Sequence, residues 1–232
     1  MPSASGSETE TDAPPTSAAA DLRRDQMLEA AAALIAERGF SETRIADVAR
    51  RAEASPGLVV YYFGTKDKLL TEALRWNEIS FYETAEQMLD RTPGLRDRLE
   101  TLVRMTCVPH REGEIASSWG LWFDLWAQAF RHPQVSKDRE DLDNRWRDII
   151  TRVVKDGIEA GEIGAGKTGA GKIGAVDARA FAVAWGALLD GLSIQVALED
   201  PEVDPERAFT IAMDYVTQSL GVPPRRSRTG RR

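Results

Sequence analysis

Residues 39–70 read GFSETRIADVARRAEASPGLVVYYFGTKDKLL, and this stretch decides the fold. Thr43 is a good N-cap for a short helix, because its hydroxyl can accept a backbone N–H of the first helical turn. A tight turn is expected at residues 52–54. Ser55 then caps a second short helix that begins with Pro56, at a position where a missing N–H costs nothing. Two short helices joined by a turn of three to four residues predict a helix-turn-helix.

The rest of the chain shows helical periodicity nearly throughout. Apolar residues recur on one helix face from Asp21 onward, and Gly39 supplies a C-terminal stop. Further helices are expected at residues 66–90, 95–107, 119–130, 138–160, 177–198 and 205–220. No stretch alternates with strand-type composition. We therefore predict an all-α protein.

The helix-turn-helix resembles the DNA-binding domain of the tetracycline-repressor (TetR) family of bacterial transcriptional regulators. The residues that carry the resemblance are Ala52, Ser55, Gly57, Tyr61, Phe63, Lys66, Leu69 and Leu70. Two positions depart from the family pattern. The turn carries Glu53 where glycine is usual, so a positive φ there would be strained. Val60 stands where the first aromatic residue of the second helix is usually a tyrosine.

The resemblance implies a three-helix, helix-turn-helix DNA-binding domain over residues 21–75 and a larger helical domain for ligand binding and dimerisation over residues 76–220. It implies a ligand-responsive regulator, a repressor that a small organic molecule releases from a palindromic double-stranded DNA operator. The second helix of the motif would enter the major groove. The residues expected at the DNA are Arg44, Ser55, Pro56, Gly57, Val59, Tyr61, Tyr62, Thr65 and Lys66.

Charge is distributed unevenly along the chain, whose net charge is −7. Residues 21–75 carry nine acidic and nine basic side chains, whereas residues 76–220 are strongly acidic and repel phosphate. Residues 1–20 are rich in Pro, Ser, Ala and Thr and are expected to be a disordered tail. Residues 221–232 form a second, basic tail with five arginines. A nucleic acid would therefore meet the N-terminal domain or the arginine tail.

Aromatic residues indicate where a ligand would bind. The segment SSWGLWFDLWAQAF places three tryptophans on one helix face, and two more lie on later helices. The plainer interpretation is an aromatic-rich core; the functional one is a pocket between helices. The candidate ligand-binding residues are Trp119, Trp122, Phe123, Trp126, Trp146 and Trp185. Because Asp124 and Asp190 accompany them, a cationic or amphipathic ligand is the favoured class.

Residues 161–168, GEIGAGKT, match the phosphate-binding pattern of nucleotide-binding proteins. Such a loop works between a buried strand and a helix. Here an amphipathic helix precedes the match, and a glycine-rich repeat follows it. We expect residues 161–176 to be a flexible loop with no role for Lys167 or Thr168 in nucleotide binding.

The last two expected helices resemble the pair through which TetR-type proteins dimerise. Apolar residues line one face of each helix, and small residues such as Ala182 and Gly186 would allow close helix contact. We expect a homodimer, because two recognition helices must meet two half-sites about one helical turn apart.

Several classes of protein are disfavoured. A single cysteine excludes a disulfide framework, and with only two histidines the sequence disfavours a metal site, so neither metal nor cofactor is expected. No secretory signal or membrane-spanning run is expected, which favours a cytoplasmic protein without a membrane partner.

The alternative to a transcriptional regulator is an all-α enzyme or carrier with an aromatic pocket. An enzyme lacks support, because Cys107 has no identifiable histidine partner and no catalytic residue is expected.

Overall fold

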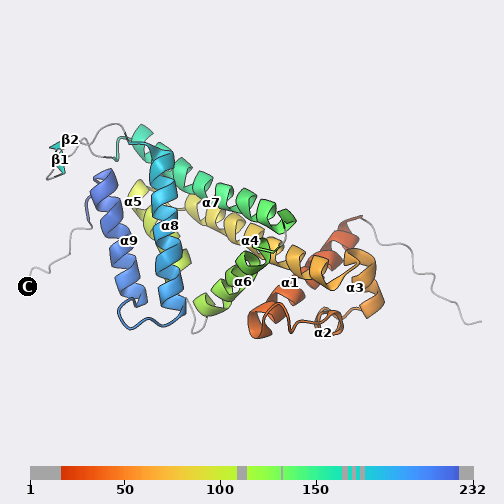
Figure 1. The fold of residues 1–232 in the computed structure, drawn as a ribbon. Helices are drawn as coiled ribbons and strands as arrows, with labels where there is room; N and C mark the ends of the chain where they lie inside the picture. Colours follow the sequence, from red (N-terminus) through yellow and green to blue (C-terminus); the bar gives the residue numbers. More distant parts are fainter. Residues whose placement is uncertain are drawn as a thin grey trace, which may run out of the picture.

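One long helix and two short ones form a small head at the N-terminal end of the chain (Figure 1). The structure, a computed structural model, describes residues 17–108, 114–131, 133–163, 167–168, 171–172 and 176–224. The helices of the head are α1 (Ser17–Arg38), α2 (Ile45–Arg51) and α3 (Pro56–Phe63). Helix α1 includes residues 17–20, which the sequence assigned to a disordered tail; residues 1–16 of that tail lie outside the described residues.

Helix α4 (Lys66–Asp90) joins the head to the rest of the molecule. The Thr65 hydroxyl caps it by accepting the backbone N–H of Lys68 at 3.2 Å. Near its start, Leu69 and Leu70 are buried in the head, and further along Tyr82 and Leu89 are buried in the body. One continuous helix therefore contributes to both cores.

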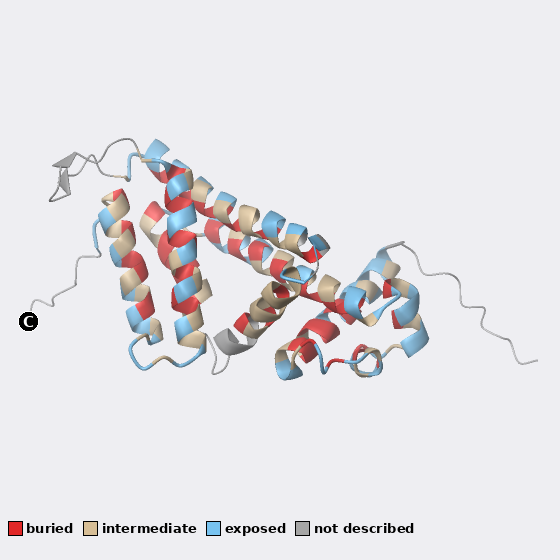
Figure 2. Ribbon diagram, in the orientation of Figure 1, coloured by how far each residue is buried: buried red, intermediate tan, exposed pale blue. Residues whose placement is uncertain are grey.

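The body consists of α4 and five further helices. These are α5 (Leu95–Cys107), α6 (Glu114–Ala129), α7 (Pro133–Glu159), α8 (Ala178–Ala197) and α9 (Pro205–Leu220). Figure 1 shows α8 and α9 side by side at the end of the molecule away from the head. In Figure 2 the buried faces of these helices turn toward one another and the exposed faces turn outward. Helices α6 and α7 each begin five residues earlier than their periodicity indicated.

In the described residues of the glycine-rich segment, no buried strand leads through a loop into a helix, as a phosphate-binding loop requires; residues 164–166, 169–170 and 173–175 of the expected loop lie outside the described part of the chain. Strands β1 (Lys167–Thr168) and β2 (Gly171–Lys172) pair antiparallel as a minimal hairpin. The helix α7 precedes this hairpin, and α8 begins only at Ala178. The fold is otherwise the all-α fold that the sequence predicted, with a helix-turn-helix at its N-terminal end.

Helix α8 is long and apolar enough, by length and composition alone, to cross a membrane. This differs from the expectation that no apolar run of the sequence is long enough to span a membrane. In the fold α8 packs against α5, α7 and α9, with Phe181, Trp185 and Leu189 buried. One face of α8 thus belongs to the core, and the other face is exposed.

Candidate functional site

The second helix of the helix-turn-helix presents one face outward. The Ser55 hydroxyl accepts the backbone N–H of Leu58 at 3.1 Å and so begins α3, with Pro56 at its first position. On the inner side, Phe63 packs in the head core. On the outer side, Gly57 and its neighbours are exposed. Helix α3 is thus anchored by its inner face and leaves its outer face free.

The structure corrects one predicted DNA-binding residue. Val59 is fully buried in the head core, so it cannot face DNA. The next residue, Val60, is 44% exposed and occupies the outer face instead. Tyr61 is 81% exposed, whereas Tyr62 packs partly against the core. The ring centroids of the two tyrosines lie 5.6 Å apart in an edge-on arrangement.

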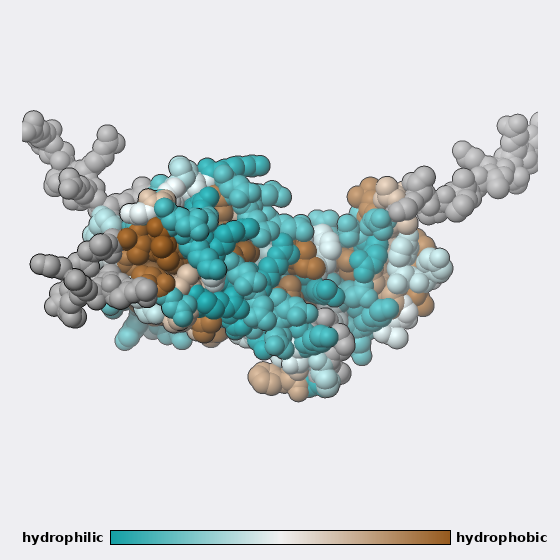
Figure 3. Space-filling view, turned by 90° about the horizontal axis from the view of Figure 1, so that it is seen from above, coloured by the Kyte–Doolittle hydropathy of each residue, from teal (hydrophilic) through white to brown (hydrophobic). Residues whose placement is uncertain are grey.

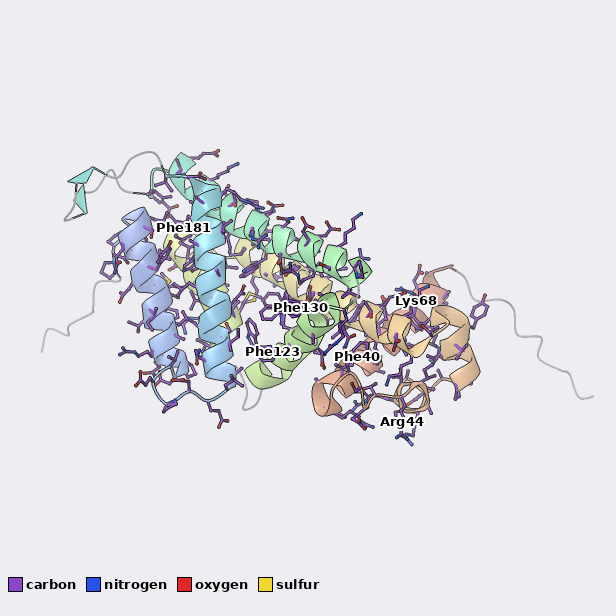
Figure 4. All side chains as sticks on the ribbon, viewed as in Figure 1. Phe40, Arg44, Lys68, Phe123, Phe130 and Phe181 are labelled. Atoms are coloured by element: carbon purple, nitrogen blue, oxygen red, sulfur yellow. The ribbon has the colours of Figure 1, made fainter. Side chains whose placement is uncertain are left out.

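Arg44 stands at the start of α2 with its guanidinium exposed. It is the N-cap residue of that helix, but its side chain makes no capping bond. The predicted cap, Thr43, is buried and donates its hydroxyl hydrogen to the carbonyl oxygen of Gly39 at 2.9 Å. Figure 4 shows Arg44 at the outer edge of the head, pointing away from the body.

Most other basic side chains of the head are engaged within the chain. Arg51 pairs with Glu37 at 2.5 Å, and Arg38 with Asp47 at 3.2 Å. The further pairs are Arg50 with Asp47 and Arg24 with Glu72. Lys66, expected to contact DNA, donates to the carbonyl oxygen of Ser41 at 2.6 Å. In the part of the chain that the structure describes, no hydrogen bond or ion pair holds the guanidinium of Arg44.

A cavity of about 520 Å³ lies within the body, between helices α4 to α8. Aromatic side chains from three helices line it, namely Phe81, Tyr82, Trp119, Trp122, Trp126 and Trp146. Tyr82 stacks on Trp146 with ring centroids 6.0 Å apart, and Trp119 and Trp122 are 6.3 Å apart. The cavity is therefore bounded by clusters of rings from several helices.

Two carboxylates line the same cavity. Asp143 is paired with Arg139, and Arg147 also lies 3.7 Å from it. Asp190 has no hydrogen bond or ion pair with any residue that the structure describes. Burial raises the pKa of Asp190 to about 6; the negative charge of Asp143 acts in the same direction, and the positive charge of Arg147, which also lines the cavity, acts against both. At neutral pH, Asp190 is thus an ionised acceptor that faces the cavity without a counter-charge in contact.

Two further polar groups in this region have no partner among the described residues. The indole Nε1–H of Trp126, whose ring lines the cavity, is buried without an acceptor. Both carboxyl oxygens of Glu78 are buried without a donor. Burial, together with the nearby charge of Asp143, raises the pKa of Glu78 to about 9 and keeps its side chain neutral at pH 7. Unpaired buried polar groups are uncommon and call for an explanation.

The structure brings together four of the six predicted ligand-binding residues and separates the other two. Trp119, Trp122, Trp126 and Trp146 line the cavity. Trp185 does not: it is fully buried, stacks on Phe181 and donates to the carbonyl oxygen of Ala212 at 3.1 Å. Phe123 packs against Trp119, with ring centroids 6.0 Å apart, and is not part of the cavity wall.

Asp124, also expected near the ligand, connects two parts of the molecule instead. Its carboxylate accepts the backbone N–H of Phe40 at 3.0 Å, and so links α6 to the segment after α1. Figure 4 places Phe40 beside the end of α6 nearest the head. The helix that carries three cavity tryptophans is therefore bonded directly to the head.

The cavity is also lined by Phe81, Tyr82, Asp143 and Met105, none of which was among the predicted ligand-binding residues. The sequence indicated only that the aromatic pair Phe81 and Tyr82 lies on helix α4. Nothing in the sequence indicated that this pair would meet Trp146, some sixty residues later, with Tyr82 stacked on its ring.

Known protein families match both the head and the body of the molecule. Residues 27–73 match the family model of bacterial regulatory proteins of the tetR family. Residues 95–221, more than half of the chain, match the model of the BetI-type transcriptional repressor C-terminal domain. The chain belongs to the TetR family. It is therefore a ligand-responsive, DNA-binding transcriptional regulator and not an enzyme.

Individual TetR-family relatives cover nearly the whole chain. The HTH-type transcriptional regulator BetI of Serratia proteamaculans is 26% identical over 203 residues, spanning 86% of this chain and 93% of the relative. A putative transcriptional regulator from Saccharomonospora viridis, solved in complex with choline, has a TM-score of 0.71 at 26% identity, covering 86% and 98%. A TetR-family regulator from Rhodococcus has a TM-score of 0.70 at 26% identity, covering 86% and 99%.

Proposed function

We propose that this regulator is a repressor that leaves its operator when a small organic cation fills the cavity of the body. The observation that carries the proposal is the carboxylate of Asp190, which has no hydrogen bond or ion pair among the described residues and shares the cavity wall with six aromatic side chains. Aromatic faces attract cations through the ring quadrupole, and the attraction is stronger where water is excluded.

The size and lining of the cavity suit a small cation that carries an oxygen. Its volume of about 520 Å³ lies within the range of small-molecule sites. The buried Nε1–H of Trp126 offers one hydrogen bond to an acceptor on the ligand. The choline bound to the Saccharomonospora relative supports a ligand of this class, because choline combines a quaternary ammonium with a hydroxyl group.

The DNA interface of the proposal consists of the outer face of α3 and the residues around it. Its members are Arg44, Ser55, Pro56, Gly57, Tyr61, Tyr62, Thr65 and Lys66, with Val60 in place of Val59. One α3 helix spans a single half-site, so a palindromic operator needs a dimer.

The proposed dimer contact lies on the last two helices, chiefly on α8. The exposed residues of α8 are all uncharged, namely Ala180, Val183, Ala184, Ala187, Gly191 and Gln195. By contrast, the exposed face of α9 is polar and includes Glu206 and Asp214. Viewed from above, hydrophobic residues gather toward the end of the molecule that carries α8 and α9 (Figure 3).

The ligand class is tested by comparing choline with its uncharged isostere 3,3-dimethylbutanol. Tryptophan fluorescence reports binding, and the anisotropy of a labelled operator reports release. We expect choline to bind at least about tenfold more tightly, and Asp190→Asn to remove most of that preference. Asp214→Asn, the same change on the exposed face of α9, should leave the preference for choline unchanged. Equal binding of both compounds to the wild type would contradict the proposal.

A further inference from the structure

The outer face of the recognition helix lacks the side chains that usually hydrogen-bond to bases. The eight residues of α3, PGLVVYYF, include no amide, carboxylate, guanidinium or ammonium group. On the outward face the exposed residues are Pro56, Gly57, Val60 and Tyr61. The hydroxyl of Ser55, just before the helix, already accepts the N–H of Leu58. The centre of this face therefore offers methyl groups and no hydrogen-bonding group.

The position of Gly57 indicates close approach to a partner. Its backbone does not require glycine through a positive φ, and a Cβ placed there would meet only the Ser55 hydroxyl, at 4.0 Å. Packing within the chain consequently leaves room for a side chain at this exposed position. The missing side chain lets an external surface come near the helix backbone beside Val60.

In the major groove, only one feature of a base edge matches a small aliphatic side chain. Each base presents hydrogen-bond donors and acceptors there, except that thymine also presents its C5-methyl group. Burying a methyl group against another apolar group stabilises a complex, whereas an aliphatic side chain on a donor or acceptor leaves that group unpaired.

We propose that Val60 recognises the C5-methyl group of a thymine in each operator half-site, so that base selection under α3 depends on methyl contact. This inference rests on the proposed function, since it takes the outer face of α3 as the DNA-binding face. The ring of Tyr61 packs edge-on against the ring of Tyr62. The Tyr61 hydroxyl can then donate a hydrogen bond to a phosphate of the DNA backbone. Hydrogen bonding to a base edge falls to Arg44, whose guanidinium is exposed and uncommitted within the described chain.

The test begins with DNA selected by the full-length protein from duplexes that contain about 20 random base pairs, enough for two half-sites. Each thymine of the selected sequence is then replaced singly by deoxyuridine, which removes only the methyl group. We expect one thymine per half-site at which the replacement weakens binding about fourfold, and about fifteenfold when both half-sites are changed.

Two variants tie the effect to Val60. In Val60→Ala the penalty at that thymine should fall to within about 1.5-fold, because the methyl contact is already lost. Val60 is partly exposed, so this change should not disturb folding. In Tyr61→Phe, which removes only a hydroxyl, the deoxyuridine penalty should persist. A penalty that also persists in Val60→Ala, or no penalty at any thymine, would overturn the inference. Failure to select any DNA would instead contradict the proposed function.

Discussion

At the scale of single residues, Glu53 lies in the turn between α2 and α3 with a φ of 51°. A positive φ in the left-handed region destabilises the folded state of an L-residue by about 1–2 kcal/mol, and glycine avoids this strain. Glycine also loses more backbone entropy on folding, which offsets part of the gain. We therefore expect Glu53→Gly to raise the free energy of unfolding by about 1 kcal/mol in denaturant titrations. Glu83→Gly, at an exposed position within α4, should lower it by about the same amount. A loss of stability at both positions would show that Glu53 is unstrained.

The buried carboxyl of Glu78 predicts a stability that depends on pH. Its pKa of about 9 lies above the ordinary value of 4.5, so between these values the folded chain holds a proton that the unfolded chain releases. The contribution of Glu78 to the free energy of unfolding is then greatest below about pH 4.5, and falls by up to about 1.4 kcal/mol per pH unit as the pH rises toward 9.

Glu78→Gln keeps the shape of the side chain and removes the titration. Urea unfolding between about pH 6 and pH 9 should therefore give a flatter stability profile for this variant than for the wild type. Glu83→Gln serves as the exposed control and should follow the wild-type profile. Parallel profiles for wild type and Glu78→Gln would refute the assignment.

The valine pair of α3 shows where sequence reasoning at this scale ends. Ser55, Pro56 and the inward-facing Phe63 were assigned correctly from capping and apolar pattern. Val59 and Val60 are chemically identical neighbours, and the helix is too short for its periodicity to separate inner from outer positions. Packing against the other helices of the head sets the rotation of α3 about its axis, and in this orientation Val59 is buried.

At the scale of helices, the bond between Asp124 on α6 and the backbone N–H of Phe40 provides a mechanical link from cavity to head. Asp124→Ala removes the acceptor, whereas Asp124→Asn keeps an oxygen at the same place. We expect the alanine variant to bind choline normally by tryptophan fluorescence but to release labelled operator at several-fold higher ligand concentration. The asparagine variant should behave much like the wild type. Unchanged release by Asp124→Ala would exclude this link as a route of coupling.

The helices themselves were largely predictable, but the cavity was only partly so. The spacing of Trp119, Trp122 and Trp126 on one face follows from helix geometry alone, and all three line the cavity. The contribution of Tyr82 depends on how α4 crosses α7, which no local pattern encodes. Trp185 was misplaced for the same reason, since its side of α8 faces α9 and its indole bonds to Ala212.

At the scale of the whole molecule, the uncharged outward face of α8 predicts how the dimer can be broken. Ala184→Glu would bury a carboxylate in the proposed contact, and a buried charge without a partner is costly. We expect this variant to be monomeric by light scattering at micromolar concentration and to bind the operator at least about tenfold more weakly. Thr210→Glu, on the polar face of α9, should remain dimeric. A dimeric Ala184→Glu would place the contact elsewhere.

Val183 and Ala187 belong both to the wall of the cavity and to the outward face of α8. Thermodynamic reciprocity then connects two quantities that are usually measured apart: if the ligand changes the association constant of the protomers, association changes the affinity for the ligand by the same factor. The dose of effector that a cell needs for induction would follow the abundance of the regulator. A regulator that represses its own gene would thus adjust its sensitivity as its copy number rises and falls.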